Sequence, residues 1–507
     1  LKEFQAKAQA GTDMILWASF QPLYDLIYAM ESNLLKRVFV KKTLDKQRIN
    51  VLNDTIPSLK TRIDRLDRLM EMLLEFQGQI PEVLSNDFGH RSPAMSKFAD
   101  VAAVFDSIHY TKKNLKKWMK PESRNASFPF NILLAKAYVQ YQPVGCVGVI
   151  SPWNYPFSLT YAPLAVILAA GNRAMIKPSE YTPQSSLLMK TMIEKYFDED
   201  EVAVFPGGPE VGEEFTSLPF DHLLFTGSTS VARKVMEAAS KNLVPVTLEL
   251  GGKSPVIVGD TADMTLVSDR VWNGKLMNCG QTCIAPDYLF IPERKMEDWI
   301  EASQTSISTM YPSIYSNDDY SSIINDKHFS RLQSYLDDAK DKGARIIEIN
   351  PAKESNEKRN HHKMMPTIVL GATDEMLVMK EEIFGPILPV KTYRKVDEAI
   401  DYINNKDRPL GMYYFGNDTS EESNVINKTV SGGVCLNDVI FHYVQEDLPF
   451  GGIGPSGMGR YHGIEGFKTF SNPRGIYKQT PFNAILKLMR PPYGKLFDGL
   501  ISSRIKK

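Results

Sequence analysis

Cysteine is scarce in this chain: its 507 residues include only Cys146, Cys279, Cys283 and Cys435. Their spacing does not match the disulfide framework of a small secreted scaffold, which favours a reducing compartment. Cys279 and Cys283 are close enough along the chain to begin a zinc site, but no second Cys or His pair lies nearby. We therefore expect a cytoplasmic protein without a bound metal.

The chain also lacks an excess of charge and any long apolar run. Its 59 Lys and Arg balance 60 Asp and Glu, a net charge of −1 that argues against nucleic acid as a partner. No apolar run reaches the roughly 18 residues needed to cross a bilayer. The N-terminus shows no basic region before a short apolar run, so a cleavable signal is not expected. The length predicts two or three packed units.

Both ends of the sequence are amphipathic. Residues 14–30 are mostly apolar but include Gln21, Pro22 and Asp25, which predicts a helix or helix pair broken near the proline. Residues 483–507 mix apolar and basic side chains. Such segments dock on protein or lie on an anionic membrane. We expect docking, with peripheral membrane contact as the alternative.

Most of the chain predicts an α/β fold. Amphipathic helices are expected from residue 59 and over 100–118, and the region 318–360 is polar with a helical tendency. Strands are expected over 138–150, 173–176, 202–205, 222–225, 246–250, 255–258, 287–291, 367–370, 387–392, 412–415 and 434–437. Helices are expected between several of them, at 183–196, 231–239 and 262–276. This alternation predicts parallel sheet covered on both faces.

The stretch NCGQTCIAP, residues 278–286, carries the most reactive candidate. Cys283 follows a Gly-Gln-Thr turn and precedes Ala-Pro, so its thiol is expected on a loop that a substrate can reach. The alternative is a buried cysteine that acts as a small apolar side chain.

Two polar residues follow predicted strands and are candidates for roles beside a nucleophile. Asn154 lies between two prolines, and its amide could stabilise an oxyanion or simply form a turn. Glu249 ends an otherwise apolar strand, where burial raises the proton affinity of a carboxylate, as a general base needs. The alternative for Glu249 is a salt-bridged strand end.

A nucleotide site is predicted where strands meet helices. Gly227 and Ser228 end a buried strand just before a helix, which leaves backbone amides for a pyrophosphate. Lys177 and Glu180 could hold one ribose, and Glu382 with Phe384 a second. Taken singly, each of these ribose contacts is better explained as a solvated strand or loop end.

Together the motifs resemble the aldehyde dehydrogenase superfamily. FTGS, LELGGKSP, GQTC, EEIFGP, PWN and KPSE occur in that family's order and spacing over roughly residues 59–477. The strings NCGQTCIAPDY and PFGGIGPSGMGRYHG resemble the branch of class 3, fatty aldehyde and coniferyl aldehyde dehydrogenases.

The resemblance implies a fold and a division into domains. The fold is α/β, with a Rossmann-type cofactor domain, an α/β catalytic domain and a small β oligomerisation element. The expected parts are an N-terminal helical extension (1–40), the NAD(P)-binding domain (41–127 and 144–248), the catalytic domain (249–445), and the oligomerisation element with the C-terminal tail (128–143 and 470–507). A homodimer is expected, as is usual in this branch.

The resemblance also implies roles. Cys283 matches the nucleophile, Glu249 the base that activates water, and Asn154 the oxyanion donor. The cofactor contacts match Lys177, Glu180, Gly227, Ser228, Glu382 and Phe384. An acid at position 180 should repel the 2′-phosphate of NADP, which favours NAD.

The implied reaction is oxidation of an aldehyde, long-chain aliphatic or aromatic, to its acid through a cysteine thiohemiacetal and thioester. The alternatives are a CoA-acylating dehydrogenase and an inactive, membrane-associated binding protein.

Overall fold

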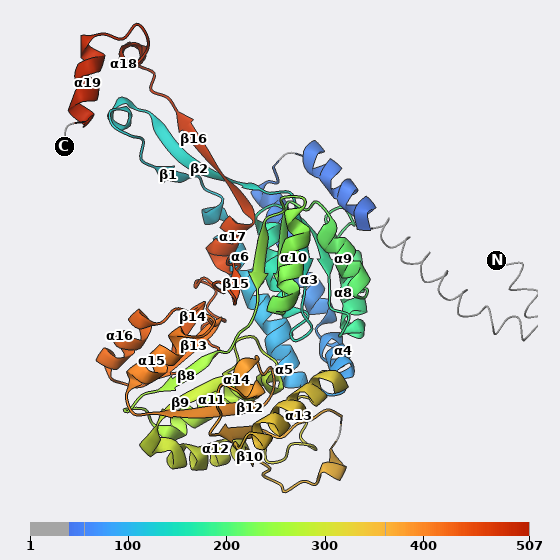
Figure 1. Ribbon diagram of the computed structural model, residues 1–507. Helices are drawn as coiled ribbons and strands as arrows, with labels where there is room; N and C mark the ends of the chain where they lie inside the picture. The colour runs from blue at the N-terminus through green and yellow to red at the C-terminus, as the bar shows by residue number, and fades with distance from the viewer. Residues whose placement is uncertain (1–39, 55, 360, 506–507) are drawn as a thin grey trace, which may run out of the picture.

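The computed structural model describes residues 40–54, 56–359 and 361–505 of the chain (Figure 1). The predicted N-terminal helix at residues 14–30 lies outside these residues. The described part begins with a helix over residues 40–53 and builds three β-sheets. Among its helices, none is both long and apolar enough to cross a membrane.

The first sheet has six strands, parallel except at one edge. In order across the sheet they are β15 (Gly457–Met458), β7 (Val246–Glu249), β6 (His222–Thr226), β3 (Cys146–Ile150), β4 (Arg173–Lys177) and β5 (Val202–Val204). Only β15 runs antiparallel to its neighbour, β7. The parallel sheet predicted for this half of the chain is therefore present, with every strand from β4 to β7 close to its expected position.

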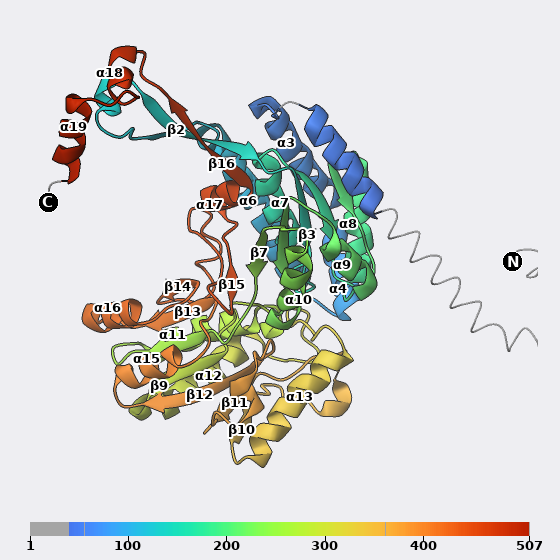
Figure 2. The same cartoon turned by 45° about the horizontal axis from the view of Figure 1, so that its top comes forward.

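Helices cover both faces of this sheet (Figure 2). They are α3 (Leu59–Phe76), α4 (Gln79–Phe88), α5 (Pro93–Lys97), α6 (Ala103–Trp118), α7 (Ser158–Ala169), α8 (Pro183–Tyr196), α9 (Pro209–Ser217), α10 (Thr229–Ser240) and α17 (Gly463–Thr469), with a π-helical turn, η1 (Phe98–Ala102), between α5 and α6. Alternate side chains of β4 enter different cores: Ala174 and Ile176 pack with α7 and α8, whereas Met175 packs with α9. A strand buried on both faces has this continuous apolar pattern.

The second sheet has seven strands. In order they are β10 (Arg345–Glu348), β11 (Thr367–Leu370), β12 (Ile387–Tyr393), β9 (Tyr288–Pro292), β8 (Pro255–Val258), β13 (Gly411–Phe415) and β14 (Gly433–Leu436). Its helices are α11 (Met264–Leu276), α12 (Met296–Met310), α13 (Asp326–Asp341), α14 (Leu377–Lys380), α15 (Val396–Asn404) and α16 (Thr419–Lys428), with short 3-10 turns at η3 (Met277–Gly280), η4 (Glu293–Lys295) and η5 (Asn356–Lys358).

The sequence pattern missed one strand of this sheet. The region 318–360 was expected to be helical, and α13 lies there, but β10 follows it and pairs antiparallel with β11. This edge strand is only four residues long, and both its end residues are exposed. So short and half-exposed a strand has too little apolar alternation to be recognised.

The third sheet forms an arm that projects from the body (Figures 1 and 2). It consists of β1 (Glu122–Arg124), β2 (Lys136–Pro143) and β16 (Ser471–Lys478), with the 3-10 turn η2 (Phe130–Leu133) between β1 and β2. Near the end of the arm lie α18 (Asn483–Leu488) and α19 (Lys495–Ile505). The continuous strand expected over 138–150 is wrong: its two halves are β2 and β3, which belong to different sheets.

Candidate active site

The Cys283 loop begins with an unusual turn after α11. Asn278, Cys279 and Gly280 have φ angles of 49°, 56° and 76°, all in the left-handed region. Such a run is costly for residues other than glycine and is found mainly where the surroundings impose it, often at functional sites. Gly280 is required, because a Cβ there would lie 2.3 Å from the Gly385 carbonyl oxygen. The chain thus reverses sharply just before the thiol.

Gln281 fixes this loop to the protein interior. Its Nε2 donates to the carbonyl oxygens of Asn278 and Ser322, at 3.0 and 2.9 Å. Its Oε1 accepts from the Ile324 amide at 2.9 Å. The buried Gln281 side chain is thereby satisfied at both ends, and it holds the two residues that precede Cys283 in one position.

The two neighbouring thiols have different surroundings. Cys279 is fully buried, with its Sγ 3.5 Å from the Tyr320 hydroxyl, and burial raises its pKa to about 12. Cys283 is partly exposed. Burial of its sulfur, followed by the nearby Glu249 and Glu382 carboxylates, raises the pKa of Cys283 well above its usual range. Of the two, Cys283 lines the pocket described below, and its raised pKa favours the protonated thiol.

Asn154 lies against this loop. It follows β3, is buried, and donates from Nδ2 to the Gln281 carbonyl oxygen at 3.0 Å. Asn278 returns a hydrogen bond from its own Nδ2 to the Asn154 carbonyl oxygen, at 3.0 Å. Because a side-chain amide has two N–H groups, one donor of Asn154 is left for another acceptor beside the loop.

Glu249 ends β7 and is almost completely buried. Its Oε1 has no hydrogen-bond partner within the part of the chain that the structure describes. Burial raises the pKa of Glu249 well above its ordinary value, and Arg460 opposes the shift. Since Glu249 also raises the pKa of Cys283, the two groups are close enough to interact electrostatically. A buried carboxyl of this kind can accept a proton near neutral pH.

Glu382 approaches the same region from the second sheet. Its Oε1 accepts from the Gly252 amide at 3.1 Å, and a Cβ on Gly251 would lie 2.2 Å from that oxygen. Burial, with a smaller effect of Asp287, raises the pKa of Glu382 to about 7. Nearby, the Phe384 ring meets the Trp153 ring edge-on, with centroids 5.3 Å apart.

The other predicted cofactor residues lie at the carboxyl ends of β4 and β6, the two strands on either side of β3. Lys177 ends β4 and pairs with Glu180, Nζ to Oε2 at 3.0 Å. Gly227 and Ser228 lie between β6 and α10, and the Ser228 side chain makes no capping bond to α10. The first amides of α10 therefore remain available to an anion, as a dinucleotide pyrophosphate needs. This edge of a parallel sheet is where such cofactors bind, so the residues present fit NAD(P).

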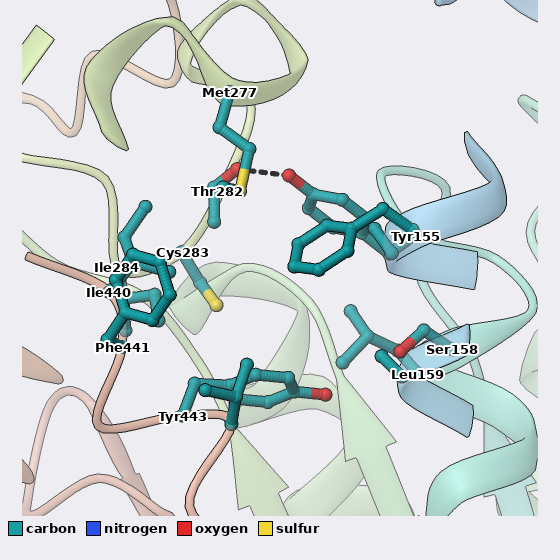
Figure 3. A pocket seen from close by; sticks show the side chains of 14 residues that line it. Tyr155, Ser158, Leu159, Met277, Thr282, Cys283, Ile284, Ile440, Phe441 and Tyr443 are labelled. Carbon is teal, nitrogen blue, oxygen red and sulfur yellow. Dashed lines mark hydrogen bonds between the residues drawn. The ribbon is translucent and has the colours of Figure 1, made fainter. Parts of the chain in front are cut away.

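A pocket opens beside Cys283, and Figure 3 shows the thiol pointing into it. Its walls are almost entirely apolar or aromatic. They are formed by Phe98, Ala99, Ala103, Tyr155, Ser158, Leu159, Met277, Thr282, Ile284, Ile440, Phe441, Tyr443 and Val444. The Tyr155 hydroxyl and Thr282 Oγ1 are hydrogen-bonded at 2.8 Å (Figure 3). Such a cavity suits a planar or extended apolar molecule that brings one polar group to the thiol.

The structure thus brings Cys283, Glu249, Asn154 and Glu382 together, while Lys177, Glu180, Gly227 and Ser228 lie along the sheet edge. The sequence did not identify the pocket walls, because Phe98, Tyr155 and Tyr443 come from three separate segments. Of these three, only Tyr155, inside the PWNYP string, lies next to a motif that the sequence analysis identified. Within residues 40–54, 56–359 and 361–505, no cluster of His, Cys, Asp or Glu is arranged to hold a metal ion.

Comparisons with known proteins agree with this geometry. The sequence profile of the aldehyde dehydrogenase family matches residues 55–476. A probable coniferyl aldehyde dehydrogenase of Caulobacter vibrioides is 50% identical over 473 residues, 93% of this chain and 98% of that protein. The coniferyl aldehyde dehydrogenase of a Pseudomonas species is 50% identical over 90% of this chain and 95% of its own length.

Solved structures show the same fold. The substrate-bound AldH of Staphylococcus aureus superposes with a TM-score of 0.85 at 36% identity, covering 92% of this chain and 99% of that one. An aldehyde dehydrogenase of Mycobacterium tuberculosis complexed with NAD+ superposes with a TM-score of 0.78 at 25% identity, over 88% of this chain and 91% of that one.

Proposed function

The chain belongs to the aldehyde dehydrogenase family, and on that premise we propose that it oxidises an aromatic aldehyde of the coniferyl type, with Cys283 as nucleophile. NAD(P)-dependent oxidation of an aldehyde to the acid follows from the family. The observation that carries the assignment of residues is one thiol, partly exposed in an apolar pocket, near a buried glutamate whose Oε1 has no hydrogen-bond partner among the described residues. Neither a CoA-acylating reaction nor a non-catalytic role finds support in the comparisons.

The first step is attack of the Cys283 sulfur on the aldehyde carbon. The raised pKa favours the protonated thiol, so its proton is released to solvent as the carbon–sulfur bond forms. The carbonyl oxygen becomes an oxyanion, which accepts hydrogen bonds from the second N–H of the Asn154 amide and from the Cys283 backbone amide. A nicotinamide cofactor supplies the acceptor for the hydride that leaves the same carbon.

The second step is hydrolysis of the Cys283 thioester. Water attacks the thioester carbon, the Glu249 carboxylate accepts a proton from that water, and the sulfur leaves as the acid is released. The raised pKa of Glu249 supports this role, because a carboxylate of ordinary pKa is a weak base toward water.

The pocket walls support an aromatic substrate. The rings of Tyr155, Phe441 and Tyr443 surround the space in front of the sulfur, and aromatic rings favour contact with one another in offset or edge-on arrangements. The two relatives at 50% identity are named as coniferyl aldehyde dehydrogenases. Coniferaldehyde is a flat conjugated molecule that such walls can enclose while its aldehyde reaches Cys283.

A panel of aldehydes tests this assignment. With coniferaldehyde, hexanal and dodecanal as substrates, we expect kcat/KM to be at least about 10-fold higher for coniferaldehyde than for hexanal. NADH fluorescence and chromatography of the carboxylic acid measure the two products independently. A higher value for dodecanal would select a long-chain aliphatic substrate instead, and no acid from any aldehyde would remove the proposed function.

We also propose that NAD is preferred over NADP because of Glu180. This carboxylate is partly exposed and pairs with the buried Lys177, so it adds negative charge where the ribose 2′-phosphate of NADP would lie. Replacing Glu180 with Gln should lower the ratio of the KM for NADP to the KM for NAD about fivefold, which is the scale of one exposed charge contact. Steady-state kinetics with each cofactor measures the ratio.

The matched control is Glu194→Gln, which breaks a different Lys–Glu pair, the exposed Lys190–Glu194 pair on α8, at 3.6 Å. That variant should leave the ratio of KM values unchanged. An equal effect of both variants, or none from Glu180→Gln, would count against the assignment of Glu180.

The arm supports a proposal about assembly. Phe128, Ile132 and Leu134, next to β2, expose about two thirds of their surface each, at 65%, 67% and 66%. We propose that a second copy of the chain covers this apolar surface in a homodimer, which the mass measured by light scattering would test. Membrane contact through α18 and α19 stays a prediction.

A further inference from the structure

The segment that carries Asn154 is held from behind by a buried ion pair. Arg91 and Asp100 both have fully buried side chains, and Arg91 Nη2 donates to Asp100 Oδ2 at 2.7 Å. Neither residue lines the pocket. The pair lies between the helical region around η1 and the segment 154–158 that follows β3.

Together the two charged groups contact both ends of this segment. Arg91 Nη1 donates to the Asn154 carbonyl oxygen at 2.9 Å, and the guanidinium carbon lies 4.9 Å from the centroid of the Tyr155 ring. Asp100 Oδ1 accepts from the amides of Phe157 and Ser158, both at 3.1 Å. These amides begin α7, where a carboxylate is favoured by the helix dipole.

The same segment presents its side chains to the Cys283 loop. Asn154 Nδ2 reaches the Gln281 carbonyl oxygen at 3.0 Å, and the Tyr155 hydroxyl reaches Thr282 Oγ1 at 2.8 Å. Gln281 and Thr282 are the two residues before Cys283. A shift of the segment would therefore move both the amide and the aromatic wall relative to the sulfur.

Asp100 owes its position to the π-helical turn. Residues 98–102 form η1 between α5 and α6, and a π turn holds an extra residue that re-aims its neighbours, a feature frequent at functional sites. Phe98 and Ala99 of this turn line the pocket, whereas Asp100 is buried against the segment 154–158. The turn η1 thus forms part of the pocket wall and also anchors the segment 154–158.

Stability alone does not account for such a pair. Burying two charges costs several kcal/mol of solvation, and apolar side chains of similar size are often as stabilising. Arg91 Nε has no hydrogen-bond partner within the described part of the chain, which adds to the cost. The pair instead fixes geometry, because a planar guanidinium donates hydrogen bonds to two acceptors in fixed directions.

We propose that Arg91 and Asp100 are positioning residues of the oxidation reaction, which act by fixing Asn154 and Tyr155 against the Cys283 loop. The inference rests on the proposed function, since it assigns these residues to the geometry around the oxyanion of that reaction. Their effect on catalysis passes through Asn154 and not through contact with the substrate.

A double-mutant cycle with Arg91→Lys and Asn154→Ala tests the proposal. Lysine keeps a cation beside Asp100, which favours folding, but cannot bond Asp100 and the Asn154 carbonyl in the same directions. We expect kcat/KM for the aldehyde to fall about 100-fold in Arg91→Lys, the scale of a misplaced catalytic group. In the Asn154→Ala background the same substitution should cost less than about threefold, because coupled residues are not additive.

The chain offers a matched control in Arg65. It is also buried, pairs with Glu201 at 3.0 Å and donates to a backbone carbonyl, that of Asn172, at 3.3 Å. Arg65→Lys should lower Tm by an amount similar to Arg91→Lys and change kcat/KM by less than about threefold. NAD affinity, measured by fluorescence titration, should be the same in all variants.

The outcomes are distinct. A wild-type protein that oxidises no aldehyde removes both the proposed function and this inference. If the wild type is active but the losses of kcat/KM from Arg91→Lys and Asn154→Ala multiply in the double variant, the inference is overturned and the proposed function is not. The same holds if Arg65→Lys loses as much activity as Arg91→Lys. A loss from Arg91→Lys that disappears in the Asn154→Ala background supports it.

Discussion

Replacing Cys283 with Ala is expected to lower kcat for aldehyde oxidation by about 10⁵-fold or more, because no other group can form the covalent intermediate. The pocket in front of this sulfur has no second nucleophile among its walls: its hydroxyl groups, on Tyr155, Ser158, Thr282 and Tyr443, are neither thiols nor paired with a base. NADH fluorescence with coniferaldehyde and chromatography of the acid measure the loss.

Cys279→Ala is the matched control, since it removes a thiol only four positions away in the same loop. Cys279 is buried against Tyr320 and is absent from the pocket wall. Its truncation should cost about 1 kcal/mol of stability through a small cavity, and kcat should stay within about threefold of wild type. Equal loss of activity in both variants would mean that the loop, and not the Cys283 sulfur, carries the reaction. NAD binding should be unchanged in both.

Replacing Glu249 with Gln is expected to separate the two halves of the reaction. Attack by Cys283 and hydride loss do not need the carboxylate, so the first turnover should still release about one NADH per active site. Hydrolysis of the thioester does need a base, and the steady-state rate should fall about 10³-fold. Rapid mixing with NADH fluorescence detects the burst, and mass spectrometry detects the acyl group that remains on Cys283.

The pH dependence provides a second readout for Glu249. The residue acts as a base only when deprotonated, and burial raises its pKa well above the ordinary value for glutamate. The steady-state rate of the wild type should therefore rise with pH through this raised pKa, and the rise should be absent in Glu249→Gln. Glu446→Gln is the control, because burial raises the pKa of Glu446 to about 7, yet its carboxylate accepts from Ser107 and lies outside the pocket wall. The role of Glu249 would be contradicted if Glu249→Gln gave no burst of NADH. It would also be contradicted if Glu249→Gln kept the rise of the rate with pH, as the control Glu446→Gln should.

The sequence was most informative where a candidate site residue lies at the end of a recognisable strand. Lys177 and Glu249 each end a strand, and Gly227 directly follows one. The apolar runs of these strands are visible in the sequence, and parallel strands bring their carboxyl ends to one edge of a sheet. It was less informative where a pattern spans a change of sheet. Residues 138–150 have the pattern of a single strand that alternates and then becomes apolar. The chain turns at Gly145, however, whose φ is 135°, and the two halves pair with different strands.

The sequence by itself determined the α/β fold class, the positions of most strands and the candidate residues on which the proposed chemistry rests, because periodicity and short motifs are local properties of the chain. The tertiary structure decided which of two neighbouring thiols opens to a pocket, which aromatic rings wall that pocket, and what holds Asn154 in place. These depend on contacts between distant segments, such as Arg91 with Asn154 and Asn154 with Gln281. Such contacts leave no periodic trace in the sequence, since they are fixed only when the helices and both sheets pack together.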